Sequence, residues 1–281
     1  MQKEFHFHWL TKFKSMSLDQ DNCKVRGHMG KTVSFDSTGD RELFMKDFLS
    51  PSGIENSFKT WKVSGKYNTK DINFKKHLIN ELIKKEIVDK EQLINYKNNL
   101  ENLHLCLHDS KKNLDDTEQN EISISFYDIS LELKNEYIKF ITNIASLFSE
   151  PIYYQEVPTF RFHFPNQKGY DWEDRYHTDV MLGHPPYEFN VWIPFTNVYD
   201  SNSMRITPLN YSLNFIKDSN YDFELFAKNV QYKEGVIKDL KEKSDSLNMS
   251  YGDFIIFDPR CLHCTQHNKT DITRISLDVR I

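Results

Sequence analysis

Two residues with metal-binding side chains are separated by one position in the segment His177–Thr178–Asp179. Among the eleven histidines of the chain, only His177 is followed two residues later by an acid. In an extended segment, residues i and i+2 project to the same side, so this imidazole and this carboxylate can reach one metal ion together. The alternative is an ordinary hydrogen-bonded histidine in a loop, because a single H-x-D pair is a weak signal.

A third metal ligand is predicted at His263, which follows the short apolar segment 253–258 and lies far along the chain from Asp179. A closed β-structure would bring a residue on a distant strand to the same ion. His184 and His267 are competing candidates for this position. Two neutral imidazoles and one carboxylate on one face of an ion leave three positions open. Non-haem Fe(II) oxygenases require these positions for a chelating co-substrate and O2, so the pattern favours an Fe(II) site.

A candidate anchor for the co-substrate follows on the next predicted strand, at Arg274. The planar guanidinium makes two parallel, charge-assisted hydrogen bonds to a carboxylate. Ser276 lies two residues further, shares the same strand face and adds a hydroxyl donor. The alternative is a surface arginine on a strand. Beside an Fe(II) site, this R-x-S pair favours 2-oxoglutarate, which chelates iron at one end and carries a second carboxylate at the other.

These residues must be positioned by strands, which the second half of the chain predicts. Residues 159–164, 188–195 and 273–281 alternate apolar and polar side chains with period two, and 253–258 is a short apolar strand. Short strands separated by turns indicate a β-sandwich or a jelly roll. The polar strand faces either meet solvent, as in many antiparallel sheets, or line the mouth of a barrel. The metal-binding pattern favours the barrel.

The first half of the chain is predicted to be mostly helical and polar. Apolar residues recur at helical spacing over 71–88, 89–111 and 131–148, with a charged connection over 109–121. Residues 1–70 give only weak signals for loops and short strands. We expect this half to buttress the sheets and to cover the pocket.

Composition is that of an ordinary globular protein, with 38% hydrophobic and 27% charged residues. The net charge of −5 gives no reason to expect nucleic acid or an anionic membrane as a partner. No apolar run is long enough to cross a bilayer and the first residues lack the features of a signal peptide, so the expected location is the cytoplasm. The expected partner is a small-molecule substrate.

The pair Cys261 and Cys264 forms a C-x-x-C motif. A zinc site would need a second pair of ligands at similar spacing, and a redox motif should open a helix after a strand. Here the motif follows Asp258–Pro259 and precedes a strand, so two incidental thiols are the favoured interpretation.

Three stretches of the sequence resemble a known family. They are PTFRFHFP (158–165), HTDVMLGHPPYEFNVWIPFTNVYDSNSM (177–204) and FDPRCLHCTQHNKTDITRISLDVR (257–280). In this order they are similar to the phytanoyl-CoA-dioxygenase-like branch of Fe(II)/2-oxoglutarate oxygenases, and most similar to bacterial members found in streptomycin and other carbohydrate gene clusters. The resemblance covers residues 158–280. It departs from the family at Cys264, where glycine is frequent, and at Met204–Arg205, where an acid often follows the N-S segment.

The resemblance implies a mainly β fold with α-helices, in which a double-stranded β-helix (a cupin-like jelly roll) carries an N-terminal helical extension. We predict one domain over 1–281, with 1–150 as helical extension and lid and 151–281 as the core with the metal site. The resemblance implies His177, Asp179 and His263 as metal ligands and Fe(II), 2-oxoglutarate and O2 as cofactors. It also implies Arg274 with Ser276 as the anchor for 2-oxoglutarate and Asn190 and Arg161 as lining residues of the co-substrate or substrate pocket, and it leaves Arg280 open between the site and a structural role. The side chains on the predicted site faces add His163, His184, Trp192 and Arg205 as candidate substrate residues.

The predicted reaction is hydroxylation of a small polar substrate with release of succinate and CO2. Halogenases of this class lack the carboxylate ligand, so Asp179 favours hydroxylation. The substrate is predicted to be a sugar, nucleotide-sugar or related natural-product precursor, with an amino acid as the alternative. Two other classes remain open: a zinc-dependent hydrolase with Glu173 or Asp174 as general base, and a non-catalytic β-barrel binding protein.

Overall fold

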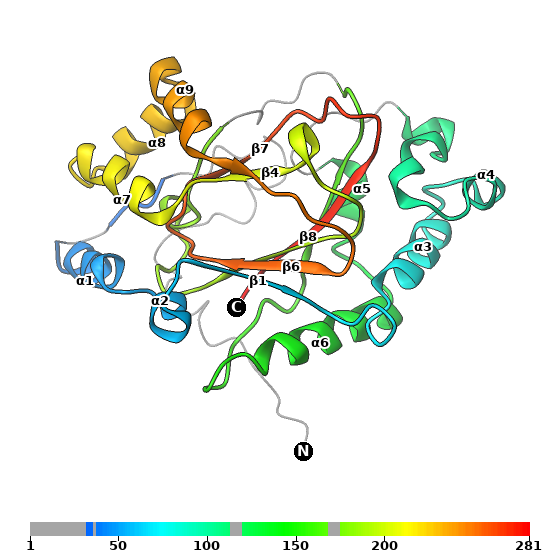
Figure 1. Cartoon of the computed structure of the whole chain (residues 1–281), viewed down its shortest axis with the longest axis horizontal. Coiled ribbons are helices and arrows are strands. Elements are labelled where there is room, and N and C mark those ends of the chain that lie inside the picture. Colours follow the sequence, from blue (N-terminus) through cyan, green and yellow to red (C-terminus); the bar gives the residue numbers. More distant parts are fainter. Residues whose placement is uncertain (1–31, 36–37, 113–119, 168–174) are drawn as a thin grey trace.

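Two antiparallel sheets form the core of the computed structural model, which describes residues 32–35, 38–112, 120–167 and 175–281 (Figure 1). The five-stranded sheet has the order β1 (Lys62–Lys66), β6 (Asp253–Phe257), β3 (Asn190–Pro194), β8 (Arg274–Arg280) and β2 (Thr159–His163). The three-stranded sheet has the order β5 (Asp245–Ser246), β4 (Met204–Ile206) and β7 (His263–Thr265). The fold is the double-stranded β-helix that the sequence predicts.

The alternation seen in the sequence places one face of each large-sheet strand in the core. On β2, Phe160 and Phe162 are buried in the main hydrophobic cluster, and on β8 Ile275 and Leu277 join them. The intervening side chains project to the opposite face, because successive residues of a strand alternate sides. The side chains on this opposite face of the sheet point toward the candidate site. All four predicted strands are therefore confirmed, each shorter by one to three residues than its sequence pattern.

Helices surround the two sheets (Figure 1). They are α1 (Thr38–Leu49), α2 (Gly53–Phe58), α3 (Phe74–Lys84), α4 (Lys90–Asn95), α5 (Glu121–Ser125), α6 (Leu131–Ala145), α7 (Leu209–Asp218), α8 (Phe223–Tyr232) and α9 (Glu234–Lys243), with 3₁₀ turns η3 (Leu100–Leu105), η4 (Asp109–Lys111), η5 (Val180–Leu182) and η6 (Asp200–Asn202). The apolar stripe of α6, which begins after an N-cap at Ser130, packs into the main cluster. The predicted helices over 71–88 and 131–148 are confirmed as α3 and α6 with shorter bounds.

Two features of the sequence interpretation are wrong. The continuous helix over 89–111 is broken after α4, because Lys97 and Asn98 adopt positive φ and Asn99 starts a 3₁₀ turn. Its leucines, such as Leu93 and Leu103, are buried nevertheless, so burial and not helicity caused their spacing. The second half also contains three helices, α7 to α9, that the strand-based interpretation overlooked. By contrast, β1, which pairs with β6, lies within residues 1–70, where the sequence gives weak signals for short strands.

Several predictions lie partly or wholly outside the described residues. These are the weak signals in 1–31 and 36–37, most of the charged connection over 109–121, and the two candidate bases Glu173 and Asp174. The expectation of one domain with an N-terminal lid remains a prediction.

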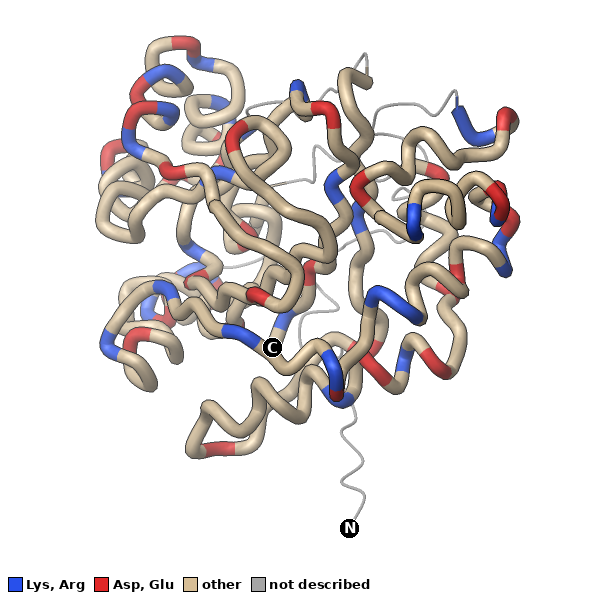
Figure 2. The backbone as a smooth tube through the Cα atoms, turned by 45° about the vertical axis from the view of Figure 1, so that its right-hand side comes forward, with Lys and Arg blue, Asp and Glu red and all other residues tan. Residues whose placement is uncertain are grey.

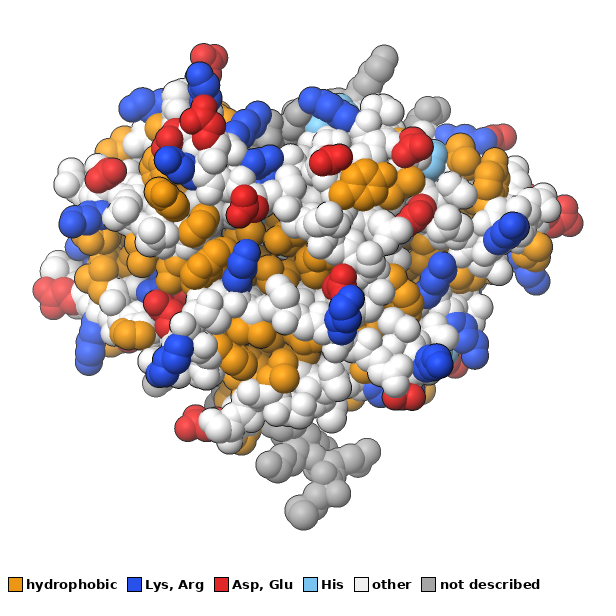
Figure 3. All heavy atoms as spheres, in the orientation of Figure 1, with side chains coloured by type: hydrophobic (Ala, Val, Ile, Leu, Met, Phe, Trp, Pro, Cys, Tyr) orange, Lys and Arg blue, Asp and Glu red, His pale blue; other side chains and the backbone are white. Residues whose placement is uncertain are grey.

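Charged residues of both signs are interspersed along the surface helices (Figure 2). On the face shown in Figure 3, apolar side chains occur in patches that are separated by Lys, Arg, Asp and Glu. Within the described segments, no helix combines the length and the apolar character needed to cross a bilayer.

Gly65 on β1 lies directly opposite Phe254 on β6, and the phenyl ring covers the glycine. A Cβ at this position would overlap that ring, which is buried in the main cluster. We expect Gly65→Ala to lower the free energy of unfolding by about 1–3 kcal/mol, because overpacking forces neighbouring groups to move. Gly235, inside α9 with open space around it, is the matched control: Gly235→Ala should stabilise by about 0.5–1 kcal/mol. Urea denaturation of both variants measures these changes. An unchanged free energy of unfolding in Gly65→Ala would contradict the packing argument.

Candidate metal centre and co-substrate pocket

The structure brings the three predicted metal ligands together. His177, Asp179 and His263 are buried, and each offers one ligand atom such that these atoms all lie within 4.8 Å of one another. Backbone hydrogen bonds hold the two histidines side by side: His177 N donates to His263 O (3.0 Å), and His263 N donates to His177 O (2.9 Å). Asp179 N donates to Pro259 O (3.1 Å). The sequence separation of these residues is therefore bridged by main-chain contacts.

Both imidazoles have one nitrogen committed to the backbone. His177 Nδ1 lies 3.3 Å from Arg175 O, and His263 Nδ1 lies 3.0 Å from Cys261 O. A carbonyl oxygen can only accept, so each Nδ1 is the donor, and Nε2 is the nitrogen of each ring left to bind a metal ion. Backbone tethers of this kind orient metal-binding histidines in general. Burial, together with His177, lowers the pKa of His263 to about 4, so that this ring is neutral at physiological pH.

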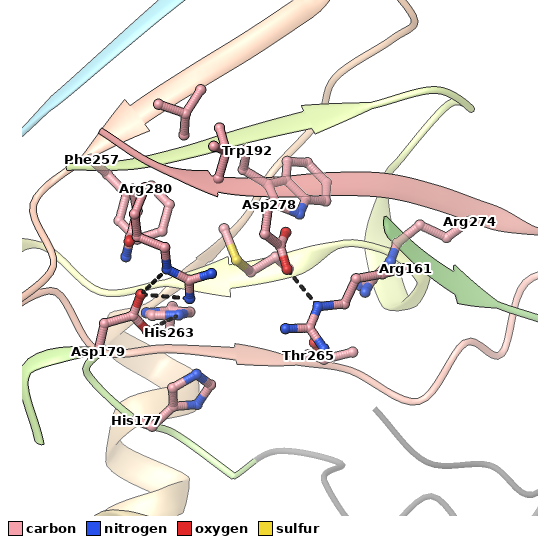
Figure 4. Close-up of a pocket in the computed structure, with 14 residues that line it drawn as sticks. Arg161, His177, Asp179, Trp192, Phe257, His263, Thr265, Arg274, Asp278 and Arg280 are labelled. Atoms are coloured by element: carbon pink, nitrogen blue, oxygen red, sulfur yellow. Dashed lines mark hydrogen bonds and ion pairs between the residues drawn. The ribbon is translucent and has the colours of Figure 1, made fainter. Parts of the chain in front are cut away.

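The carboxylate of Asp179 is ionised and held by an arginine. Burial alone would raise its pKa, but Arg280 and the neighbouring histidines hold that pKa well below its usual range. Arg280 donates twice to Oδ2 of Asp179, from Nε (3.1 Å) and from Nη2 (2.8 Å), as Figure 4 shows. Oδ1 faces the histidines and lies 3.6 Å from His263 Nε2. Two imidazole nitrogens and one anionic oxygen thus converge, a donor set that suits Fe(II).

A pocket opens beside this centre, and its lining includes seven of the predicted site residues. These are Arg161, His177, Asp179, Asn190, Trp192, His263 and Arg274. The three candidate ligands lie at one end of the pocket, and Arg161 and Arg274 lie at the other (Figure 4).

Two buried polar side chains next to the pocket have no hydrogen-bond partner among the described residues. They are Asn190, through both its oxygen and its nitrogen, and Ser276, through its hydroxyl. A buried polar group without a partner costs free energy unless something else bonds to it. Asn190 lines the pocket itself, and Ser276 is the register partner of Arg161. A polar molecule bound here would satisfy both, and the residues present therefore fit a dicarboxylic co-substrate.

A second ion pair lies within the pocket. Arg161 Nε donates to Asp278 Oδ2, and both residues line the cavity (Figure 4). His163, at the end of the same strand, is buried, and burial together with the charges of Arg274 and Arg161 lowers its pKa well below the usual value. It therefore lies close to the anchor as a neutral ring. Trp192, Phe257 and other apolar side chains complete the wall.

Of the four predicted substrate residues only Trp192 lines the pocket, and His163, His184 and Arg205 do not. The guanidinium of Arg205 donates to the Ser244 hydroxyl (2.9 Å) and carbonyl (2.6 Å) and to Lys241 O (2.6 Å), so it ties β4 to the end of α9 and does not line the pocket. His184 does not line the pocket either. Its Nδ1 lies 3.0 Å from Glu188 Oε1, and although burial opposes protonation, this carboxylate raises the pKa of His184.

Replacing Arg205 tests whether its side chain stabilises the fold or binds a ligand in the pocket. We expect Arg205→Met to lower the free energy of unfolding by about 1–3 kcal/mol, since it leaves the acceptors of α9 without a charged donor. Because the guanidinium lies outside the pocket, the affinity of the metal-loaded protein for 2-oxoglutarate should not change. Urea denaturation and a 2-oxoglutarate titration measure the two quantities. If the variant kept its stability and bound 2-oxoglutarate more weakly, the prediction of Arg205 as a site residue would be favoured instead.

The sequence interpretation did not assign two charged residues of the pocket. The sequence predicts no role for Asp278, and for Arg280 it leaves both a site role and a structural role open. The signal was present in the alternation of β8, which puts Arg274, Ser276, Asp278 and Arg280 on one strand face. Cys261 and Cys264 are buried and form no disulfide within the described part of the chain, and burial raises the pKa of Cys261 well above its usual value, which agrees with the interpretation as incidental thiols.

A family model described as phytanoyl-CoA dioxygenase (PhyH) matches residues 89–276, which is more than half of the chain. The chain belongs to this PhyH family. The PhyH match ends at Ser276, so it includes all three candidate ligands and Arg274 but not Arg280. The cofactors of the PhyH family are Fe(II), 2-oxoglutarate and O2, and its members are dioxygenases.

Individual relatives are more distant. Streptomycin biosynthesis protein StrG from Streptomyces griseus is 25% identical over 132 residues, which cover 47% of this chain and 47% of StrG, about half of its length. Among solved structures, the chain is similar to EctD from S. alaskensis with 2-oxoglutarate and 5-hydroxyectoine (TM-score 0.46, 13% identity, 92% of this chain and 82% of that chain). It is also similar to AviO1 from Streptomyces viridochromogenes Tue57 (TM-score 0.41, 12% identity, 87% and 95%).

Proposed function

We propose that this protein is an Fe(II)/2-oxoglutarate-dependent oxygenase that hydroxylates a small polar substrate. The observation that carries the proposal is the convergence of His177 Nε2, His263 Nε2 and one oxygen of Asp179 in a buried site beside an arginine-lined pocket. Membership of the PhyH family supports the cofactor set. Ferrous iron with 2-oxoglutarate and O2 supplies the oxidising power for such a reaction, and the protein supplies binding and orientation.

The residues of the chain have distinct tasks in this proposal. His177, Asp179 and His263 hold the metal. Arg274, which is buried at 2% exposure on β8, pairs with the far carboxylate of 2-oxoglutarate, and Ser276 adds a hydroxyl next to it. Asn190 lines the pocket opposite Arg280 in the strand register and offers both a donor and an acceptor. The buried position of these groups keeps bulk water from competing for their hydrogen bonds.

The substrate is proposed to be a sugar, a nucleotide-sugar or a related natural-product precursor. The Arg161–Asp278 pair presents a donor and an acceptor side by side, which matches the hydroxyl groups of a sugar, each of them both donor and acceptor. The name of StrG, a streptomycin biosynthesis protein, supports a role in natural-product biosynthesis. An amino acid is the alternative substrate, since its carboxylate and ammonium groups would bind by separating the same pair.

The first test is anaerobic addition of Fe(II) and then 2-oxoglutarate, followed by visible absorption. We expect a weak metal-to-keto-acid charge-transfer band that is lost in His177→Ala and needs at least tenfold more 2-oxoglutarate in Arg274→Ala, because one charge-assisted pair is worth roughly 1.5–3 kcal/mol. Arg274→Lys keeps the charge, so the 2-oxoglutarate concentration that it needs should lie between those of wild type and Arg274→Ala. If no band forms while Zn²⁺ binds tightly, the oxygenase proposal is wrong and a zinc hydrolase is favoured.

A substrate panel follows from a positive result. Succinate release above the substrate-free background should appear with sugars or nucleotide-sugars. Release with amino acids alone would leave the oxygenase proposal intact and replace the sugar by the alternative substrate class.

A further inference from the structure

The contact between Arg280 and Asp179 is one-sided, and this asymmetry has a chemical meaning. Both guanidinium hydrogen bonds go to the same carboxylate oxygen, Oδ2, while Oδ1 lies 3.6 Å from His263 Nε2. An aspartate next to a metal ion can bind it through one oxygen or through both. In this arrangement the second oxygen is already occupied by a buried cation.

The position of Arg280 is fixed by the backbone on both sides of its strand. Its carbonyl accepts a hydrogen bond from Gln155 N (2.9 Å). The next residue, Ile281, exchanges two hydrogen bonds with Phe189, at 2.8 and 3.0 Å. The guanidinium is therefore delivered to Asp179 by strand pairing and not by a mobile loop.

Asp179 is fixed as well. It is 1% exposed, its N–H bonds to Pro259 O, and its carbonyl accepts from the N–H groups of Leu182 (3.0 Å) and His184 (3.2 Å). Main-chain hydrogen bonds thus fix both backbones, and the two hydrogen bonds from Arg280 hold one carboxylate oxygen on the side of the arginine.

We propose that Arg280 is a positioning residue that restricts Asp179 to a one-oxygen contact with the metal and thereby keeps a coordination position open. The inference rests on the proposed function. In a six-coordinate site, two histidines and one carboxylate oxygen leave three positions for co-substrates, whereas two carboxylate oxygens would leave two. A chelating keto acid takes two positions, so the third exists only while the second oxygen of Asp179 is held away.

Charge supports this role over simple tightening of the metal site. Arg280 is a cation beside the place where a divalent cation would bind, so by itself it opposes metal binding. An arginine that served only to raise metal affinity would be poorly placed here. An arginine that controls how the carboxylate binds the metal must contact the second carboxylate oxygen, as Arg280 does.

The test uses Mn²⁺ as a probe of wild-type protein, Arg280→Met and Arg280→Lys, with water-proton relaxation as the readout. Inner-sphere exchangeable waters of Mn²⁺ enhance this relaxation in proportion to their number. We expect Arg280→Met to bind Mn²⁺ at least as tightly as wild type, with an inner-sphere enhancement per bound ion lower by about one third, as three open positions become two. With saturating 2-oxoglutarate, wild type should keep about one third of its enhancement, and Arg280→Met should fall to the outer-sphere background.

Arg280→Lys keeps a cation and one donor, and its enhancement should lie nearer to wild type than that of Arg280→Met. Arg41→Met, which removes an exposed arginine of α1, is the control for loss of positive charge and should match wild type. The inference is overturned if Arg280→Met keeps the wild-type enhancement with and without 2-oxoglutarate, or if it loses Mn²⁺ altogether. If wild-type protein binds neither Mn²⁺ nor Fe(II), the proposed function itself fails, which distinguishes the two failures.

Discussion

Asp179→Ala is expected to abolish iron binding and turnover, and also to lower the stability of the metal-free protein. The first effect follows from loss of the one anionic ligand. The second follows from Arg280, which is left as a largely buried cation without its carboxylate. Breaking a buried pair on one side costs about 3–5 kcal/mol, and we expect roughly 3 kcal/mol because Arg280 is 23% exposed. Urea denaturation and the charge-transfer band measure the two effects, in chloride-free buffer because a halide can take the place of a missing carboxylate.

The double variant Asp179→Ala/Arg280→Met is the control for this prediction. Removing both charges should restore most of the lost stability, because neither a buried anion nor a buried cation remains. It should not restore iron binding. An Asp179→Ala protein that still gives the charge-transfer band without halide would contradict the assignment of Asp179 as a ligand.

The sign of the pH dependence follows from the same pair. The pKa of Asp179 is lower in the folded protein than its usual value near 3.9. The stabilisation from the pair is therefore fully present above about pH 4 and is lost as the pH falls toward the lowered folded value. The difference in stability between wild type and Asp179→Ala should accordingly shrink in strongly acidic buffer.

Arg260→Met is expected to destabilise the fold by about 3–5 kcal/mol. Arg260 is 2% exposed, and its guanidinium bonds to both oxygens of Asp258, to Phe48 O (2.8 Å), to Ser50 O (2.9 Å) and to Glu55. It therefore connects the turn between β6 and β7 with α1 and α2. Its removal leaves Asp258, with 0% exposure, as an unpaired buried anion. The free energy of unfolding from urea titration is the measurement.

An exposed ion pair provides the matched comparison. Lys66 bonds to Asp253, but its side chain is 82% exposed, so Lys66→Met should change stability by less than about 1 kcal/mol. Arg260→Met/Asp258→Asn should recover part of the loss, since the buried anion is then neutral. Equal effects of the Arg260 and Lys66 replacements would show that burial does not control the strength of these pairs.

The strands and the metal ligands could be predicted from the sequence because both follow short-range rules. Alternation along β2, β3 and β8 reports which side chains face the core, and one residue between His177 and Asp179 is enough to put both on one side. The third ligand needed the assumption of a closed β-structure. That assumption was correct here because His263 begins a strand next to the H-x-D segment.

What the sequence did not predict depends on tertiary partners. Arg205 and Arg280 are both strand arginines, and only the acceptors around them decide that one ties α9 to β4 while the other holds Asp179. The break after α4 depends on three successive residues that adopt turn conformations within a leucine-rich pattern. The helices α7 to α9 had local signals, including an N-cap at Asp222, but the expectation of strands obscured them.

The mutual hydrogen bonds of His177 and His263 make these two amides a gauge of opening at the centre. Each is protected only while the two chain segments stay together, so their hydrogen exchange reports separation of the metal ligands. An ion that binds only the joined arrangement stabilises it by about 2.7 kcal/mol at a hundred times its Kd. Hydrogen exchange at these two amides should then slow roughly a hundredfold. Amides of α3 that exchange through local opening of the helix, while the ligands stay together, should keep their exchange rates. The free energy of separating the metal ligands can therefore be measured by hydrogen exchange, without any turnover.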